Sequence, residues 1–206
     1  MPSSFSNHLF QSSLLLVILL FTCSFIHPTQ QAIENPQQQA KSTNFIRTSC
    51  SATTYPKLCI TSLSSHANLI QTNRKVLTDM ALNVTLSSAK STSAFMYSIA
   101  KSRGLKPREV SAMKDCVEEL SDAVDELRKS IGEMGQLKIS NFEITMSDLQ
   151  TWVSAALTEE NTCTEGFQGN AVNGNVKTVV RGRIVNVGQL TSNALALINQ
   201  LASNHY

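Results

Sequence analysis

One amphipathic segment, residues 107–131, constrains the fold of this chain more than any other stretch. Its apolar residues recur at steps of three and four with charged residues between them, which is typical of a helix with one buried face. Pro107 suits the first turn of this helix, because its missing N–H has no intrahelical partner there. Cys116 lies on the apolar face, where it can join this helix to a neighbour by a disulfide. The apolar positions are Val110, Met113, Val117, Leu120, Val124, Leu127 and Ile131.

The N-terminal residues differ in composition from the rest of the chain. Residues 14–26 form an apolar run of 13 residues, shorter than the roughly 20 residues that a membrane-spanning helix needs. A short polar stretch precedes this run, so we predict a secretory signal peptide over residues 1–28. The stretch before the run has no Lys or Arg and no small-x-small motif fixes the cleavage site; an uncleaved anchor is the alternative.

Removal of the signal peptide would leave four cysteines, Cys50, Cys59, Cys116 and Cys163. An even number of cysteines in a secreted chain predicts two disulfides, for which three pairings exist. Zinc binding is the other common use of cysteine, but the chain has no Cys-x-x-Cys motif and the mature region contains two histidines. We therefore expect no metal site.

The mature chain is predicted to begin with a lead-in and a small helical element. Residues 29–43 are rich in Gln and show no periodicity, which predicts a disordered lead-in. Residues 44–63 have the pattern of two short helices joined by a turn before Pro56. This helical hairpin would bring Cys50 and Cys59 face to face.

The rest of the domain, residues 64–206, shows four long helical patterns. Short connections between them predict an all-α, up-down-up-down four-helix bundle. Its second and third helices then run antiparallel, which brings Cys116 beside Cys163. The pairing of Cys50 with Cys59 and of Cys116 with Cys163 requires no crossing of the chain. The four helices are expected at residues 64–103, 107–131, 146–167 and 171–202.

The sequence also predicts a break, a loop and a close helix contact within this bundle. The first of the four helices is long for a globular protein, and we expect a bend or break among Ser87, Ser88 and Ser91. Residues 132–145, which include two glycines, are expected to form a loop. In the last helix, Gly182 and Gly188 predict close approach to a neighbouring helix, because interior glycines otherwise only destabilise.

The sequence Asn83-Val84-Thr85 is an acceptor motif for N-linked glycosylation. Asn83 falls on the polar face of the first long helix, together with Asp79 and Lys90. We therefore expect an exposed, glycosylated Asn83. The alternative is a chance occurrence, because the motif is short.

Charge is strongly segregated along the chain, although the formal net charge is only +2. Residues 41–108 contain ten Lys or Arg and one acid, residues 109–165 contain thirteen acids and four Lys or Arg, and residues 166–206 contain three Lys or Arg and no acid. Acidic and basic helices can attract each other inside the bundle. Alternatively, the acidic second and third helices present a surface that attracts a positively charged partner.

The sequence offers little support for catalysis. A catalytic site needs His, Asp or Glu side chains that converge in a cleft, whereas the acids here occupy exposed helical positions. Glycine-rich phosphate loops are absent, and the basic residues lack the clustering with aromatics that is typical of nucleic-acid binding. We expect no enzyme activity, no cofactor, no small-molecule substrate, no nucleic-acid partner and no membrane association after signal cleavage.

Four motifs in order make the chain resemble the plant invertase and pectin methylesterase inhibitor family over about residues 45–202. The resemblance implies a four-helix bundle with an N-terminal helical hairpin, the two disulfides named above, and secretion to the apoplast and cell wall. The motifs are Cys50-x8-Cys59, Asp115-Cys116 before the acidic helix, residues 151–158 leading to Thr162-Cys163, and residues 190–198.

The family divides by target enzyme. Its invertase inhibitors carry a Pro-Lys-Phe triplet near the start of the third helix, where this chain has residues 139–142, Ile-Ser-Asn-Phe. Trp152 and the Ser-Ala-Ala-Leu-Thr run after Val153 are typical of the pectin methylesterase inhibitors. The resemblance thus implies an inhibitor of pectin methylesterase, with inhibition of a cell-wall or vacuolar invertase as the alternative. The same domain also precedes esterase catalytic domains, but this chain ends after the bundle and is expected to act as a separate protein.

Family complexes imply which residues meet the partner. The second and third helices cover the substrate cleft of the esterase in a reversible one-to-one complex. By position, Glu118, Asp122 and Thr162 are the expected contacts. Many target esterases are basic proteins, which favours a partner role for the acidic surface. Glu118 and Asp122 as merely solvated charges are the alternative.

Overall fold

The computed structural model describes residues 35–102, 104–168 and 175–203, and within these ranges all regular structure is helical. The expected signal peptide and residues 29–34 of the expected lead-in lie outside the described residues. No helix among the described residues has the length and apolar character needed to cross a membrane. The helices are α2 (Pro36–Cys50), α3 (Pro56–Leu63), η1 (Ser64–His66), α4 (Ala67–Ile70), α5 (Arg74–Ala100), α6 (Pro107–Gly135), η2 (Ile139–Asn141), α7 (Phe142–Gly166) and α8 (Asn175–Ser203).

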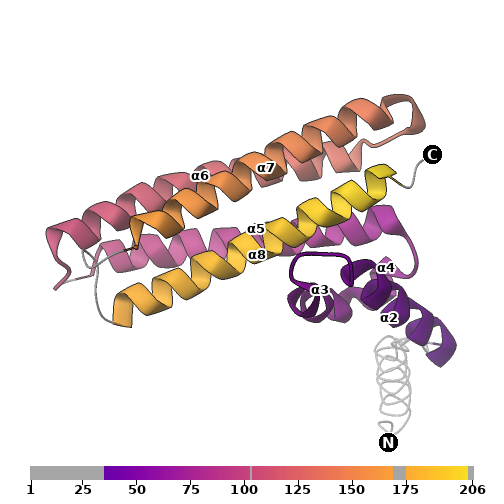
Figure 1. The fold of residues 1–206 in the computed structure, drawn as a ribbon, viewed down its shortest axis with the longest axis horizontal. Coiled ribbons are helices and arrows are strands. Elements are labelled where there is room, and N and C mark those ends of the chain that lie inside the picture. The colour runs from indigo at the N-terminus through magenta and orange to yellow at the C-terminus, as the bar shows by residue number, and fades with distance from the viewer. Residues whose placement is uncertain (1–34, 103, 169–174, 204–206) are drawn as a thin grey trace, which may run out of the picture. The chain divides into compact units, whose positions relative to one another are not determined.

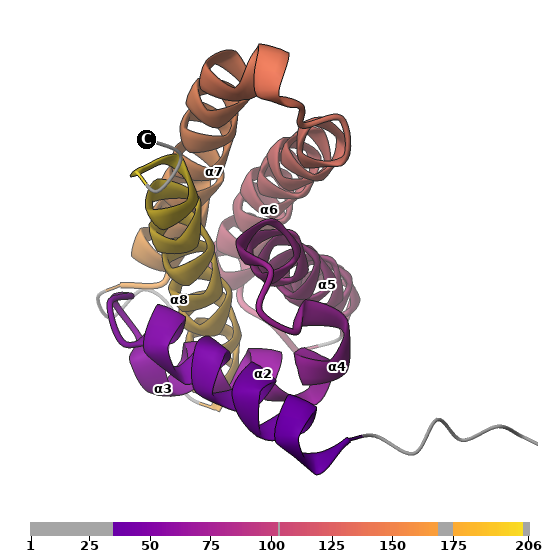
Figure 2. The same cartoon turned by 90° about the vertical axis from the view of Figure 1, so that its right-hand side faces the viewer.

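The four long helices, α5 to α8, form the predicted up-down-up-down bundle (Figures 1 and 2). Helix α6 packs against α5 and α7, and α8 packs against the same two helices. Helix α5 is therefore diagonal to α7. Helices α2 to α4 pack at one end of the bundle, against α5 and α8, and the start of α6 and the end of α7 lie at the opposite end (Figure 1). The all-α fold class predicted from the sequence is confirmed.

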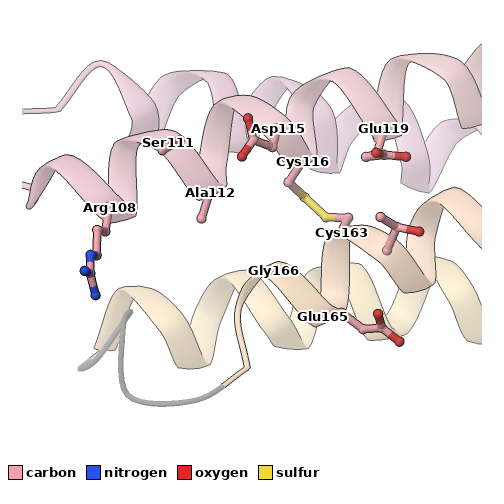
Figure 3. A pocket seen from close by; sticks show the side chains of 10 residues that line it. Arg108, Ser111, Ala112, Asp115, Cys116, Glu119, Cys163, Glu165 and Gly166 are labelled. Atoms are coloured by element: carbon pink, nitrogen blue, oxygen red, sulfur yellow. A yellow bond between two sulfur atoms is a disulfide. The ribbon is translucent and has the colours of Figure 1, made fainter.

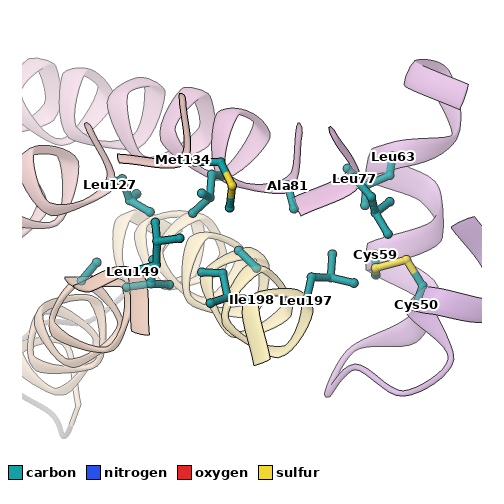
Figure 4. Close-up of a cluster of buried hydrophobic side chains, with 14 of the residues drawn as sticks. Cys50, Cys59, Leu63, Leu77, Ala81, Leu127, Met134, Leu149, Leu197 and Ile198 are labelled. Atoms are coloured by element: carbon teal, nitrogen blue, oxygen red, sulfur yellow. A yellow bond between two sulfur atoms is a disulfide. The ribbon is translucent and has the colours of Figure 1, made fainter. Parts of the chain in front are cut away.

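The apolar face of α6 is buried as its periodicity predicts. Met113, Leu120 and Leu127 have no exposed surface. Toward the hairpin end of the bundle, side chains from four helices meet, among them Leu127, Leu149 and Ile198 (Figure 4). Burial of each such side chain contributes about 1.5–3 kcal/mol relative to leaving it exposed, so the apolar stripes hold the bundle together.

Both disulfides have the predicted pairing. Cys50 at the end of α2 joins Cys59 in α3, across a sequence separation of 9, and closes the helical hairpin (Figure 4). Cys116 in α6 joins Cys163 in α7, across a sequence separation of 47. All four cysteines are buried. One disulfide therefore lies within the hairpin and the other within the α6–α7 pair.

The N-terminal part of the hairpin is longer than expected. Residues 36–43, predicted as disordered lead-in, form the first turns of α2. Pro36 is compatible with a first helical turn, and Ser42 is buried, with its hydroxyl donating a hydrogen bond to the carbonyl oxygen of Gln38. The prediction for these residues was wrong, because packing on the domain outweighs the weak helical pattern of a polar segment.

The first long helix breaks at a different place from the one predicted. The break lies at residues 71–73, where Gln71 has a positive φ of 50° and the side chain of Asn73 accepts a hydrogen bond from the N–H of Val76. From Arg74 onward α5 is continuous through the serine cluster at residues 87–91. Buried neighbours such as Ala89 hold this stretch helical, so its three serines do not interrupt it.

The loop expected at residues 132–145 is much shorter in the structure. Helix α6 continues to Gly135, and α7 begins at Phe142, which is buried. The glycine prediction was wrong: a Cβ on Gly182 would meet no atom within 4 Å, whereas one on Gly188 would lie 3.7 Å from Glu160 Oε2. Helix α7 thus lies at an ordinary contact distance from Gly188 and no atom lies that near Gly182, so neither glycine is needed for the helices to approach each other.

Candidate functional site

A groove of about 500 Å³ runs between the start of α6 and the end of α7 (Figure 3). The Cys116–Cys163 disulfide bridges the two helices within it. Helix α6 contributes three charged side chains and α7 contributes a hydroxyl and a carboxylate. These polar side chains are Arg108, Asp115 and Glu119 on α6, and Thr162 and Glu165 on α7.

The negative charge of the groove continues along the two helices as the acidic seam, which we define as Glu119, Asp122 and Glu126 of α6 with Glu159 of α7. The pKa of Glu159 is raised to about 7, first by burial and then by the charges of Asp122, Glu126 and Glu119. Lys129 lowers it, but does not offset these effects. The three carboxylates of α6 therefore act on Glu159 across the α6–α7 contact.

The acidic seam is neutralised within the protein only in part, at Glu126. Lys129 pairs with Glu126 at 3.0 Å, and Arg128 pairs with Asp125, so both of these ion pairs lie within α6. One carboxylate oxygen each of Glu126 and Glu159 is buried without a hydrogen-bond partner. The seam carboxylate that is exposed and outside these two ion pairs is Asp122.

Of the three residues expected to meet a partner, one lies in the groove and one in the acidic seam. Thr162 lines the groove, and Asp122 belongs to the acidic seam beside Glu159. Glu118 is exposed but does not line the groove. The residue that lines it is Glu119, which lies about 100° further around the helix because an α-helix has about 3.6 residues per turn.

Sequence reasoning missed Glu119, Glu126 and Glu159. A signal for the first two is present in the sequence, because Asp115, Glu119, Asp122 and Glu126 recur at steps of four, three and four, which places them on one face of a helix. Their alignment with Glu159 depends on how α6 and α7 pack. That relation could not be derived from either helix alone.

The groove is suited to binding rather than to catalysis. Its charged groups are three carboxylates and one guanidinium, and it contains no nucleophile paired with a base. Among the described residues, no group of His, Cys, Asp or Glu is arranged to hold a metal ion. The arrangement can attract a basic protein surface through its charge and accept hydrogen bonds from it.

A second carboxyl group, Glu160, is buried on the other side of α7. It is 1% exposed, and one of its oxygens accepts a hydrogen bond of 2.8 Å from the Thr191 hydroxyl on α8. Burial raises its pKa to about 8; the Thr191 hydrogen bond opposes this shift, and the charge of Glu159 adds to it. Glu160 is therefore mostly protonated below that pH.

We expect Glu160 to make the protein less stable as pH rises. Its folded pKa of about 8 lies above its model value of 4.5, so between these values the unfolded state releases the proton and the folded state retains it. From pH 5 to pH 7 this difference lowers the free energy of unfolding by about 2 kcal/mol. In Glu160→Gln that part of the decrease should vanish, as measured by guanidinium denaturation at both pH values.

The amide of the variant keeps the acceptor for Thr191, so its helical circular dichroism should match that of the wild type. Equal pH dependence of stability in the two proteins would contradict the assignment of a raised pKa to Glu160.

Comparison with known proteins agrees with this fold. A family model described as plant invertase/pectin methylesterase inhibitor matches residues 44–197. The chain is 45% identical over 194 residues to pectinesterase inhibitor 11 of Arabidopsis thaliana, an alignment that covers 92% of this chain and 96% of that protein. It is 44% identical over 169 residues to the 21 kDa protein of Daucus carota, covering 81% and 88% of the two chains.

A crystal structure of a mutant pectin methylesterase inhibitor from Arabidopsis has the same fold. It superimposes with a TM-score of 0.60 at 23% identity, covering 73% of this chain and 92% of that one. The family description and the name of the Arabidopsis relative denote inhibitors and not enzymes, as expected from the sequence. With a matching family model over most of its length and close relatives along nearly all of it, the chain belongs to the plant invertase/pectin methylesterase inhibitor family.

Proposed function

We propose that this protein inhibits pectin methylesterase by forming a reversible one-to-one complex that blocks the substrate cleft of the enzyme. The observation that carries the proposal is the family match together with 45% identity to a protein named pectinesterase inhibitor. In the complex the inhibitor performs no chemistry. It excludes methyl-esterified pectin from the esterase by occupying the space that the polymer needs.

The α6–α7 face is the surface that we assign to the esterase. The groove and the acidic seam concentrate carboxylates there, and Asp122 and Thr162 are both exposed on it. A surface of this charge speeds association with a basic partner and disfavours an acidic one. We therefore expect the target to be an esterase with a positively charged rim around its cleft.

Inhibition of an acid invertase is the second candidate, because the family description includes both enzymes. The region that carries Pro-Lys-Phe in invertase inhibitors is η2 and the start of α7 in this protein. Ile139 there is 88% exposed, whereas Phe142 is buried. A buried Phe142 would not be available to enter an enzyme active site, which favours the esterase.

The experiment that tests the proposal is a titration of methanol release from esterified pectin. A plant pectin methylesterase is mixed with increasing amounts of the oxidised protein, and an acid invertase is assayed in parallel. We expect esterase activity to fall with a one-to-one equivalence point while invertase activity is unchanged. The mass of the complex, measured by light scattering after size-exclusion chromatography, should equal the sum of one copy of each protein.

Loss of invertase activity alone would replace this proposal with the second candidate. Methanol release by the protein without any esterase would contradict a purely steric role. Activity of both enzymes at full level would contradict inhibition of either.

We also propose that the protein is secreted to the cell wall and carries a glycan on Asn83. The side chain of Asn83 is exposed on α5, which is diagonal to α7. A glycan there would leave the α6–α7 face free. Thr85 is buried, with its hydroxyl bonded to the carbonyl oxygen of Ala81 at 2.8 Å, so the glycan would be added before α5 folds.

Treatment of the plant-expressed protein with a glycosidase that removes N-linked glycans should lower its mass by that of one glycan. Asn83→Gln should show the lower mass without treatment and inhibit the esterase equally well. An unchanged mass after treatment with a glycosidase active on plant glycans would contradict the modification.

A further inference from the structure

A second pocket, separate from the groove, lies between α7, α8 and the turn before α3. Its volume is about 320 Å³, at the lower end of the range of about 300–1,000 Å³ that is usual for ligand sites. Leu157 and Ile184 give it apolar walls, and the polar side chains of Glu160, Asn161 and Gln189 also line it. It thus combines apolar surface with a few polar groups.

The turn that closes this pocket is fixed in place. The amide nitrogen of Tyr55 donates to Asn193 Oδ1 at 2.9 Å, and Asn193 Nδ2 donates to the carbonyl oxygen of Tyr55 at 3.0 Å. The hydroxyl of Ser192 donates to Thr54 Oγ1 at 3.1 Å. Asn193 is buried. Because these bonds hold the turn on α8, the pocket is formed before anything binds.

Glu160 supplies this pocket with a strong acceptor that the rest of the protein leaves unused. Its Oε1 accepts the hydrogen bond from Thr191, but its Oε2 is buried and has no hydrogen-bond partner. A buried carboxylate oxygen without a partner is rare, because each such group loses its hydration. A group that donates N–H bonds and carries positive charge would satisfy it best.

Gly188 keeps the space beside this oxygen open. A Cβ at position 188 would lie 3.7 Å from Glu160 Oε2 and 3.9 Å from Leu157 Cδ1. Both distances are ordinary contacts, so the glycine is not required to avoid a clash with the neighbouring helix. Its lack of a side chain instead leaves room next to the carboxylate.

We propose that this pocket binds the guanidinium or primary ammonium head of an organic cation, with the ionised form of Glu160 as the charged acceptor and Gly188 as the gap through which the head approaches. Asn161 and Gln189 contribute neutral polar groups at the pocket wall, and Leu157 and Ile184 receive the alkyl part. The head comes either from a free small molecule or from a Lys or Arg side chain of the esterase. Only the second source depends on the proposed function.

Charge near the pocket favours a cation. Glu159 is the charged group that acts on Glu160 from α7, Tyr55 is the ionisable side chain of the turn, and the described residues of α8 that line the pocket are uncharged. A proton competes with the ligand for Glu160, whose pKa is raised to about 8. From pH 8.5 to pH 5.5 the affinity for the cation should therefore fall by about 100-fold.

The first test measures the thermal unfolding of the protein with agmatine, which carries both head groups. At pH 8.5, 10 mM agmatine should raise the Tm by about 3–5 °C, as expected for a Kd near 1 mM. Tetramethylammonium has the same kind of charge but no N–H donor. At the same concentration it should raise the Tm by less than about 1 °C. The shift with agmatine should be much smaller at pH 5.5.

Two variants connect this shift to the pocket. Glu160→Gln removes the charge and keeps the size of the side chain, and Gly188→Ala fills the space beside Oε2 without a clash. Both should lose most of the agmatine shift. Asp148→Asn removes one carboxylate from α7 outside the pocket, and this variant should keep the full Tm shift with agmatine. Circular dichroism checks that every variant is folded.

The esterase assay distinguishes the two sources of the head group. The assay is run at pH 8.5, where Glu160 is ionised. If the head belongs to the partner, Glu160→Gln should then inhibit at least 10-fold less strongly and agmatine should compete with inhibition. If the head belongs to a free small molecule, neither Glu160→Gln nor agmatine should change inhibition of the esterase. An agmatine shift in Glu160→Gln equal to that of the wild type would overturn the proposal. The proposal would also be overturned by two results together: agmatine raises the Tm of the wild type no more than tetramethylammonium does, and Glu160→Gln inhibits the esterase as strongly as the wild type.

Discussion

Replacement of Cys116 and Cys163 together by alanine is expected to lower the free energy of unfolding by about 4 kcal/mol. The reason is the sequence separation of 47 between the two cysteines: a cross-link that closes a long loop removes many conformations from the unfolded chain. For a domain of this size the Tm should fall by about 8–16 °C. Guanidinium denaturation followed by circular dichroism measures the free energy directly.

The second disulfide provides a matched control. Cys50 and Cys59 are also buried, but they are only 9 residues apart. Their replacement by alanine should cost about 2.7 kcal/mol by the same argument, so the two double variants should differ by about 1 kcal/mol. An equal or larger loss in the hairpin variant would show that loop length does not determine the effect. Because Cys116 and Cys163 also bridge the groove, only their variant should weaken inhibition.

Reversal of charge in the acidic seam is expected to abolish most of the inhibition. The double variant Glu119→Lys/Asp122→Lys places two positive charges on the surface assigned to a basic partner. Like charges that face each other across an interface cost several kcal/mol, so the affinity for the esterase should fall by about 1,000-fold, or about 4 kcal/mol. Surface plasmon resonance measures both rates, and the association rate should lose most of its dependence on salt.

Single reversals test which face of α6 meets the esterase. Glu119→Lys, Asp122→Lys and Glu118→Lys all change the net charge equally. Glu119 lines the groove and Asp122 belongs to the acidic seam, whereas Glu118 does neither. The first two should weaken binding by about 10–100-fold, and Glu118→Lys by less than about 3-fold. If Glu118→Lys has the largest effect, the partner covers the outer face of α6 and the groove is not the contact. None of the three should destabilise the fold, because reversal reduces repulsion among the carboxylates.

The features that could be predicted from the sequence are those encoded by local repetition. The steps of three and four in residues 107–131 predict α6 and its buried face, and the antiparallel order of the helices predicts that Cys116 meets Cys163. The break before α5 could not be predicted in this way. It depends on the positive φ of Gln71, a conformation that glycine would signal and glutamine does not.

The site was harder to predict than the fold for a similar reason. A shift of one position, from Glu118 to Glu119, is small in the sequence but turns a side chain by about 100° around the helix. Glu160 is a stronger example. Its neighbours Glu159 and Asn161 are not buried, and only the packing of α8 against α7 shows that this one acid lies under Thr191.

The positions of the disulfides divide the protein into two covalently independent parts. Both cysteines of one disulfide precede Lys101, and both cysteines of the other follow Lys106. Exposed Lys101 lies at the start of the connection between α5 and α6, where a trypsin-like protease could cut after it; Lys106 is followed by Pro107, which prevents a cut there. A cut after Lys101 would give two fragments, each with its own disulfide, that separate in denaturant without a reducing agent. A cut between α6 and α7 would leave its two fragments joined by the Cys116–Cys163 disulfide. The α6–α7 face therefore stays covalently linked after such a cut, whereas the bundle as a whole does not after a cut between α5 and α6.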